Sequence, residues 1–157
     1  MSDESPAAHE TDFERTNRNW QELLQELRVT QTGVQILTAF LLVLPFQRRF
    51  PALSESQEWL YVGVLMGSIV STGLIVAPVC FHRVMFRQRL RPWLVDAGDR
   101  AARAGLLTMA LTMSGAVLLV VDVAVGRVGA SIAALASVLF FAILWWALPI
   151  SVLRRTR

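Results

Sequence analysis

The sequence predicts an all-α membrane protein with four transmembrane helices in an antiparallel bundle, preceded by a cytoplasmic amphipathic helix. Hydrophobic residues make up 54% of the 157 positions, more than an ordinary soluble domain carries. Charged residues are confined to a few segments, and the long runs between them approach or exceed the roughly 20 residues that cross a bilayer. Because no water reaches the backbone in hydrocarbon, such runs must be helices.

The first part of the chain is expected to lie outside the bilayer. Residues 1–17 are polar and hold too few large apolar side chains to offset the entropy of ordering them, which predicts a disordered cytoplasmic tail. In residues 18–28, Trp20, Leu23 and Leu27 recur on one helical face, as in an amphipathic helix at the membrane surface. Neither stretch has the hydrophobic core of a cleavable secretory signal, so the first span is expected to direct insertion.

Four apolar stretches follow and form the predicted transmembrane domain, residues 29–153. The first is slightly short and polar at its start, whereas the other three are long enough to span, and only Asp122 brings a charge into them. A basic cytoplasmic end closes the chain at 154–157. The predicted spans are residues 29–46, 59–81, 104–125 and 128–153.

Arginine counts predict the topology, because positively charged short loops stay in the cytoplasm. Twelve arginines precede the first span, separate the second from the third, or follow the fourth, and only Arg48, Arg49 and Arg127 lie on the other side. Both termini are therefore expected in the cytoplasm, with Trp59 and Tyr61 at the outer interface. The arginines expected to contact anionic lipid headgroups are Arg83, Arg87, Arg91, Arg154 and Arg155.

The two outer connections differ in length. Residues 47–58 contain Pro51 and a helix-start signal at Ser54-Glu55-Ser56, whereas Gly126-Arg127 is hardly more than a turn. The third and fourth spans are therefore expected to form a tight hairpin.

Small residues recur every four positions in two of the predicted spans. Small side chains let helix backbones approach closely, which replaces the hydrophobic drive that is missing between helices in lipid. We expect these faces to hold the bundle together, and homodimerisation through one of them is the alternative. The two small-residue stripes are Gly63, Gly67 and Ser71 in the second span and Gly129, Ala133 and Ser137 in the fourth.

A polar stripe runs along the first span, because Arg28, Gln31, Gln35 and Thr38 recur at steps of three and four residues. A side-chain amide in hydrocarbon needs a hydrogen-bond partner, so this face is expected to point into the bundle. Interhelical hydrogen bonding, at about 1 kcal/mol or less per bond, is the favoured interpretation. A polar vestibule that opens to the cytoplasm is the alternative.

Asp122 is the one acidic residue within a predicted span, and an intramembrane carboxylate is a candidate for proton or cation handling. It lies about 5 Å along the helix from the outer end of its span, where Arg127 and water can reach it. An interfacial carboxylate is therefore favoured over a proton carrier.

Residues suited to enzymatic or metal chemistry are sparse, and we expect no catalytic residue, no metal site and no cofactor. The two histidines, His9 and His82, cannot ligate haem together within the bundle, and Cys80 with His82 makes too small a set for zinc. His82 stands among arginines at the inner membrane face and is a candidate proton sensor. No nucleic-acid motif accompanies the net charge of +3, so lipid is the expected partner of that charge.

Two segments resemble a family of small bacterial four-helix membrane proteins of unknown function: Asn19 to Gln35 (NWQELLQELRVTQTGVQ) and Ala77 to Arg83 (APVCFHR). The likeness covers nearly the whole chain after the tail. It implies a place in the bacterial cytoplasmic membrane but no established mechanism, although some members look to carry an automatic sodium:proton antiporter label. The resemblance also directs attention to the segment from Glu22 to Gln35 and to His82.

Two classes of function remain. The favoured one is a non-enzymatic membrane module that packs with itself or with another membrane protein. The alternative is a small cation/proton antiporter or transporter component that acts as an oligomer, with Gln31, Gln35 and Asp122 along a pathway. The sequence disfavours this alternative, because coupled proton exchange usually needs a carboxylate near the midplane and this chain has none there.

Overall fold

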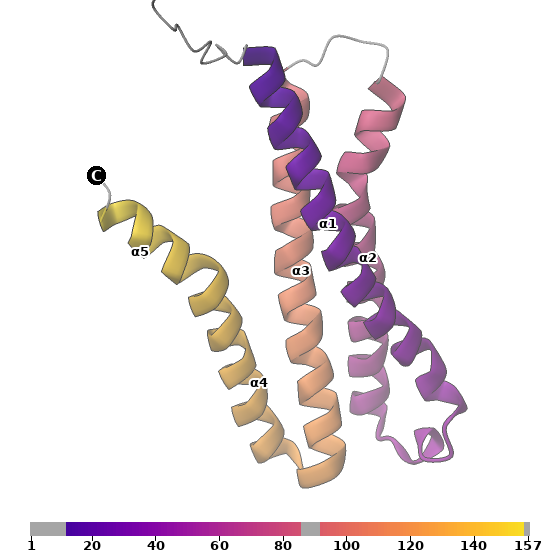
Figure 1. Ribbon diagram of the computed structural model, residues 1–157. Helices are drawn as coiled ribbons and strands as arrows, with labels where there is room; N and C mark the ends of the chain where they lie inside the picture. Colours follow the sequence, from indigo (N-terminus) through magenta and orange to yellow (C-terminus); the bar gives the residue numbers. More distant parts are fainter. Residues whose placement is uncertain (1–11, 86–91, 156–157) are drawn as a thin grey trace, which may run out of the picture.

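The protein is described by a computed structural model over residues 12–85 and 92–155, and the elements described there are all helical (Figure 1). The four long helices alternate in direction along the chain, each running antiparallel to the one before it (Figure 1). The long helices are α1 (Asp12–Val43), α2 (Glu55–Met85), α3 (Pro92–Val125) and α4 (Arg127–Ala142). The short elements are the 3-10 turns η1 (Leu44–Phe46) and η2 (Phe50–Ala52), the π-helical segment η3 (Ile143–Ala147) and helix α5 (Leu148–Arg155).

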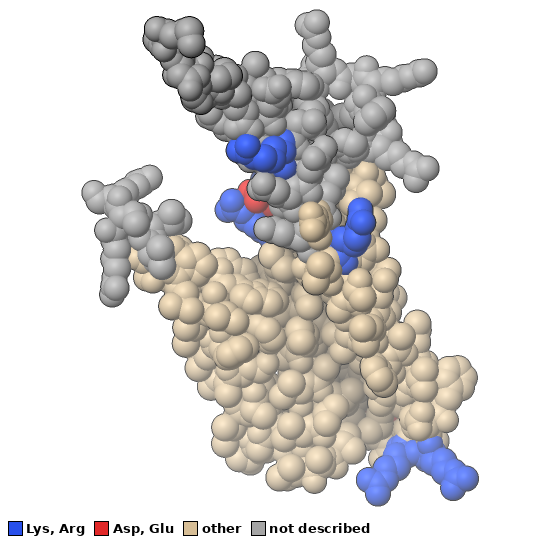
Figure 2. All heavy atoms as spheres, viewed as in Figure 1, with Lys and Arg blue, Asp and Glu red and all other residues tan. Residues whose placement is uncertain are grey.

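Within the described residues, four helical stretches are long and apolar enough to cross a membrane, which indicates a membrane protein. Each of them overlaps one predicted span, so the predicted number and order of apolar helices are confirmed. In Figure 2 an uncharged band separates basic side chains at the two ends of the molecule. The stretches are Arg28–Phe46, Glu55–Phe81, Asp96–Val125 and Arg127–Ser151.

Helix α1 contains both the amphipathic lead-in and the first span, which were predicted as separate regions. It begins at Asp12, so residues 12–17, assigned to the tail, are helical, and the amphipathic lead-in continues into the first span without a break. The rest of the predicted tail, residues 1–11, lies outside the described residues. The described part of α3 begins at Pro92. Proline is compatible with the first turn of a helix, where its missing N–H leaves no hydrogen bond unmade.

Packing between α2 and α3 is the closest in the molecule, because glycines of each helix face bulky residues of the other. A Cβ added at Gly105 would lie 2.8 Å from Ile75 Cγ1, and one at Gly115 would lie 2.8 Å from Val64 Cγ2. Between these points the buried Ser71 hydroxyl donates a hydrogen bond of 2.9 Å to the Gly105 carbonyl oxygen. Close backbone approach and a buried hydrogen bond thus hold these two helices together.

Two apolar clusters lie between α1, α2 and α3. Val34, Ile75 and Ala102 form one in the half of the molecule where α1 begins. The other lies toward the connections between helices and contains Leu41, Tyr61, Val64 and Leu119. Tyr61 is therefore buried between helices, whereas Trp59 is 69% exposed. The predicted place of both residues at the outer membrane interface stays a prediction.

Helices α3 and α4 form the expected tight hairpin, with only Gly126 between them. Gly126 has φ +97°, a backbone conformation that favours glycine because it has no Cβ. Among the described residues, α4 contacts α3 but neither α1 nor α2, and it diverges from α3 with distance from the turn (Figure 1). Because α4 packs on α3 alone, the arrangement of the four helices is open on one side.

The predicted fourth span, residues 128–153, is not one regular α-helix. Five residues, Ile143–Ala147, form a π-helical segment just before Pro149. A proline ring collides with the carbonyl four residues earlier, here that of Trp145, and a wider turn at this place relieves the collision. The segment contains two tryptophans, Trp145 and Trp146, whose ring centroids lie 6.4 Å apart.

Candidate functional site

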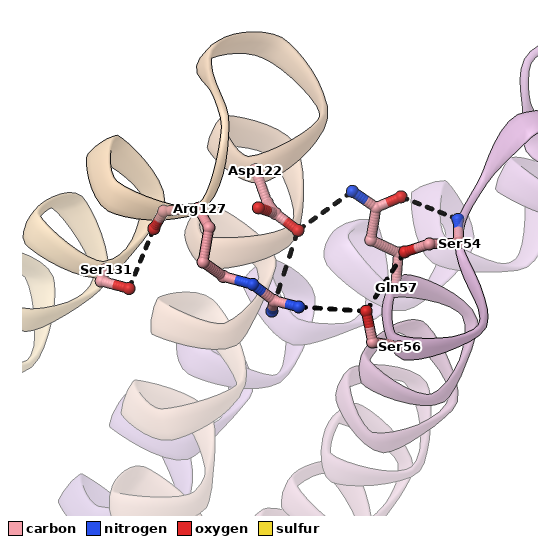
Figure 3. A network of polar contacts seen from close by, with 6 residues as sticks. All are labelled: Ser54, Ser56, Gln57, Asp122, Arg127 and Ser131. Atoms are coloured by element: carbon pink, nitrogen blue, oxygen red, sulfur yellow. Dashed lines mark hydrogen bonds and ion pairs between the residues drawn. The ribbon is translucent and has the colours of Figure 1, made fainter.

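Polar side chains from three helices meet at the end of the molecule where α2 and α4 begin and α3 ends, which we call the hairpin end (Figure 3). The group, named here the hairpin-end cluster, consists of Ser54, Ser56, Gln57, Asp122 and Arg127. It joins α2 to the α3–α4 hairpin.

Local sequence places Gln57 in the cluster. Ser54 precedes α2 and Gln57 follows three residues later, the spacing of a capping box. The Gln57 Oε1 atom accepts a hydrogen bond of 3.0 Å from the Ser54 backbone N–H, which would otherwise be unpaired at the helix start. This contact turns the amide nitrogen toward α3, where Nε2 donates a hydrogen bond of 3.0 Å to Asp122 Oδ2.

Asp122 is almost fully covered, since only 6% of its side chain is exposed. It lies in the last turn of α3, where the helix dipole disfavours an anion by roughly 0.3–1 kcal/mol. Two contacts offset this: the hydrogen bond from the Gln57 amide, and an ion pair with the guanidinium of Arg127, whose Nη1 lies 3.9 Å from Oδ2. The prediction that Arg127 reaches Asp122 is therefore confirmed.

Arg127 is the exposed member of the cluster, with 60% of its side chain in solvent. Its Nη2 donates a hydrogen bond of 3.0 Å to the Ser56 hydroxyl, and its backbone carbonyl accepts one from Ser131 (Figure 3). An ion pair at 3.9 Å with one exposed partner contributes less than about 1 kcal/mol. Of the two contacts that Asp122 makes, the 3.0 Å hydrogen bond from Gln57 is thus stronger than the ion pair with Arg127.

Chemically, the cluster is suited to holding helices rather than to moving ions. The Asp122 oxygen that faces α2 already accepts from Gln57, and the carboxylate lies three residues from the end of α3, as predicted. Among residues 12–85 and 92–155, no three His, Cys, Asp or Glu side chains lie close enough together to hold a metal ion.

The polar stripe of α1 does not point into the core as expected. Arg28 and Gln35 are exposed and Gln31 is half-buried, whereas the core face of α1 is formed by Val34 and Leu41. Thr38 donates its hydroxyl proton back to the Val34 carbonyl oxygen over 2.8 Å. An interhelical hydrogen bond from the stripe to α2 or α3 is therefore not among the contacts of the described residues.

Gln35 instead borders an open groove of about 450 Å³ between α1 and α2. Its other lining residues are Thr38, Ala39, Leu42, Ile69, Thr72 and Gly73. Asp122 lies in the other half of the molecule, near the end of α3. Gln35 is about 16 Å of helix away from Phe46, where the first span ends at the same side of the molecule. Gln35 and Asp122 thus lie at different depths along the helices.

The small-residue stripes take part in packing unequally. Gly67 and Ser71 face α3: a Cβ at Gly67 would lie 2.5 Å from Thr112 Oγ1, and Ser71 bonds to Gly105. Gly63 is exposed, and a Cβ there would meet nothing within 4 Å.

In α4, Ser137 is the stripe member with a contact to another helix, because the Ser114 hydroxyl of α3 donates to it over 3.2 Å. A Cβ at Gly129 would lie 3.6–3.9 Å from Val125 and Val121 of α3, at ordinary contact distance, and Ala133 is half-buried. The fully buried position of α4 is Ala130, which the stripe does not include.

Several predicted residues cannot be compared with the structure. The side chains of His82, Arg83, Arg87, Arg91, Arg154 and Arg155 lie outside the described residues, so the proton-sensor and headgroup hypotheses stay predictions. Cys80 is exposed.

Sequence reasoning missed three kinds of contact. The first is the contact of Gln57, which the sequence could have indicated because Gln57 follows Ser54 by three residues, the spacing of a capping box. The second is the small-residue face of α3, at Gly105, Thr112 and Gly115, which recurs at steps of seven and three residues. The third is Tyr61, whose partner could not be identified without the end of α1.

A family model described as a family of unknown function, DUF6328, matches residues 9–149, nearly the whole chain. The chain belongs to DUF6328. This confirms the resemblance to a family of unknown function that the sequence suggested. The DUF6328 match includes every residue of the hairpin-end cluster and the whole α1–α2 groove, but it brings no activity with it. Comparisons with curated proteins and with solved structures gave no match.

Proposed function

We propose that this DUF6328 chain is a non-enzymatic integral membrane module, with both termini in the cytoplasm, that packs with a second copy of itself or with another membrane protein. The α1–α2 groove is the contact we propose for this packing. The four apolar helices and the excess of arginine at one end support the membrane setting and the topology. The cytoplasmic membrane of a bacterium is the proposed location.

The Gln35 amide is the observation that carries the proposal. It is exposed within the span Arg28–Phe46, about 10 Å along the helix from Arg28, and none of the described residues forms a hydrogen bond with it. An amide without a hydrogen bond costs about 1–3 kcal/mol in an apolar environment. Lipid tails cannot supply that bond, whereas a polar group of another transmembrane helix can.

The groove beside Gln35 has the shape that such a helix needs. Gly73 and Ala39 are small lining residues, and a Cβ at Gly73 would meet nothing within 4 Å. The backbone of another helix therefore has room to approach closely. The Thr72 hydroxyl, which also lines the groove, donates its proton to the Ser68 carbonyl oxygen in its own helix and forms no hydrogen bond with the Gln35 amide. The neighbouring helix must therefore bring its own donor or acceptor.

A second copy is the first partner to test, because two Gln35 amides related by a two-fold axis can each donate to and accept from the other. The full-length chain, labelled with donor or acceptor dye at Cys80, its only cysteine, is reconstituted in liposomes at several protein-to-lipid ratios. Energy transfer should rise with protein density and should fall several-fold in Gln35→Leu. Ile36→Val, at the next exposed position of α1, is the matched control and should behave as the wild type.

Two results would contradict self-association and would leave another membrane protein as the partner of the groove. A wild-type chain that stays monomeric at every density, or a Gln35→Leu variant that associates as well as the wild type, would exclude self-association through the groove. Cation-dependent proton flux in the same liposomes, abolished by Asp122→Asn, would instead support the antiporter alternative. The same preparation therefore tests both classes of function.

A further inference from the structure

An apolar pocket opens at the hairpin end, separate from the α1–α2 groove and from the hairpin-end cluster. It has a volume of about 180 Å³ and lies between the α1–α2 connection and α3. Its apolar walls are Leu44, Phe50 and Leu53 on the connection and Leu119, Val120 and Val123 on α3. Each of the three α3 residues lies within about 9 Å along the helix of Val125, where α3 ends. In a membrane the pocket would lie just below the surface.

The size of the pocket limits what it can hold. It exceeds the roughly 150 Å³ of an engineered apolar cavity that binds benzene, but it is smaller than the roughly 300 Å³ at which ordinary small-molecule sites begin. It therefore fits a segment of a hydrocarbon chain rather than a whole ligand. The polar residues in its lining, Gln47 and Arg49, are both exposed.

Positive charge stands beside this opening. Arg48 and Arg49 are both exposed, and neither forms an ion pair with a described residue. The nearest acidic residues in the chain, Glu55 and Glu58, are exposed in the first turn of α2 and make no ion pair with the two arginines. Figure 2 shows basic side chains projecting at the α1–α2 connection, away from the rest of the surface. The pair therefore remains open to an external anion.

We propose that this pocket binds one anionic glycerophospholipid, with an acyl chain segment against Leu119, Val120 and Val123 and the phosphate at Arg49 and Arg48. The two parts of the site match the two parts of such a lipid: an apolar slot for the tail and adjacent arginines for the headgroup. The lipid also gives a reason for two arginines at the end of the molecule where the positive-inside rule disfavours them.

The test measures how many lipids the purified full-length chain retains, by native mass spectrometry from nanodiscs that contain phosphatidylglycerol and phosphatidylcholine with identical acyl chains. The wild type should retain one phosphatidylglycerol in preference to phosphatidylcholine. An arginine near a membrane surface contributes about fivefold to the binding of anionic lipid, so Arg49→Gln should lower the preference about fivefold and Arg48→Gln/Arg49→Gln further. Arg28→Gln, an exposed arginine at the other end of the first span, is the charge-matched control and should leave the preference unchanged.

A second variant tests the tail. Val120→Phe fills the pocket from an exposed position, which the fold should tolerate, and should lower retention of both lipids without changing their ratio. Unchanged retention in Val120→Phe, an unchanged lipid ratio in the double arginine variant, or an equal loss in Arg28→Gln would each overturn the proposal. Complete displacement of the lipid by soluble glycerol phosphate would also overturn it, because it would assign the site to the headgroup alone.

Discussion

The Tyr61 hydroxyl donates a hydrogen bond of 3.0 Å to the carbonyl oxygen of Leu41, across the contact between α2 and α1. In a continuous helix this carbonyl would accept from the backbone N–H of residue 45, but residue 45 is proline and has none. Both Tyr61 and Leu41 are buried, at 5% and 3% exposed, so water does not replace the missing donor. Tyr61 thus satisfies the end of α1 where Pro45 interrupts its hydrogen bonds.

Tyr61→Phe should lower the free energy of unfolding by about 0.5–1.5 kcal/mol, because it removes one buried hydrogen bond while keeping the ring. Thermal or denaturant unfolding in detergent micelles, followed by circular dichroism, measures the change. Trp59→Phe, at an exposed position two residues earlier in α2, should change the free energy of unfolding by less than about 0.5 kcal/mol.

The same contact allows a double-mutant test. Pro45→Ala restores a backbone N–H four residues after Leu41, so it should recover part of the stability that Tyr61→Phe loses. Additive effects of the two substitutions would show that Tyr61 does not act through the Leu41 carbonyl.

Asp122→Ala should destabilise the chain by about 1.5–3 kcal/mol, because it removes the charged acceptor of a short hydrogen bond and leaves the Gln57 amide unpaired. Asp122→Asn keeps an acceptor oxygen and should lose less. Arg127→Gln should cost below about 1 kcal/mol, because the guanidinium is exposed and 3.9 Å from the carboxylate. Unfolding in micelles gives all three values, and an Asp122→Ala variant as stable as Arg127→Gln would contradict this ranking.

Gly105→Ala should destabilise the α2–α3 pair by about 1–3 kcal/mol, because the added Cβ would lie 2.8 Å from Ile75 Cγ1 and 3.2 Å from the Ile75 backbone nitrogen. Ile75 is 1% exposed and cannot move aside without shifting its helix. Gly63→Ala is the matched control, since its Cβ would meet nothing within 4 Å, and it should be neutral or gain about 0.5–1 kcal/mol from helix propensity. Equal effects of the two substitutions on unfolding would refute the close approach.

Features set by local sequence could be predicted from the chain alone. The apolar helices follow from the length of uncharged runs, and the α3–α4 hairpin follows from one glycine between two helical segments. The contact of Asp122 with Arg127 was predictable for the same reason, because both lie beside that turn. In each case residues close in sequence determine the result.

Features set by the pairing of distant segments could not be predicted. Gln57 reaches Asp122 across 65 positions, and the place of Tyr61 depends on where Pro45 ends the hydrogen bonding of α1. The prediction of which face of α1 lies inside was also wrong. The apolar face with Val34 and Leu41 is buried, whereas the face with Gln35 is exposed. The open packing of α4 on α3 alone depends on side-chain shape, which periodicity does not encode.

The proposed topology predicts that the hairpin end and the opposite end of the molecule react with thiol reagents from different sides of the membrane. In a Cys80→Ser background, a cysteine is placed by Arg48→Cys in the α1–α2 connection or by Arg100→Cys near the start of α3, both exposed positions. Because positively charged loops stay in the cytoplasm, a membrane-impermeant maleimide should label the Arg48→Cys chain in intact cells and the Arg100→Cys chain only after permeabilisation. The Cys80→Ser chain without an added cysteine should remain unlabelled. Labelling of both cysteines in intact cells would mean that the second span, which separates the two positions, does not cross the bilayer, and the proposed topology would then be wrong.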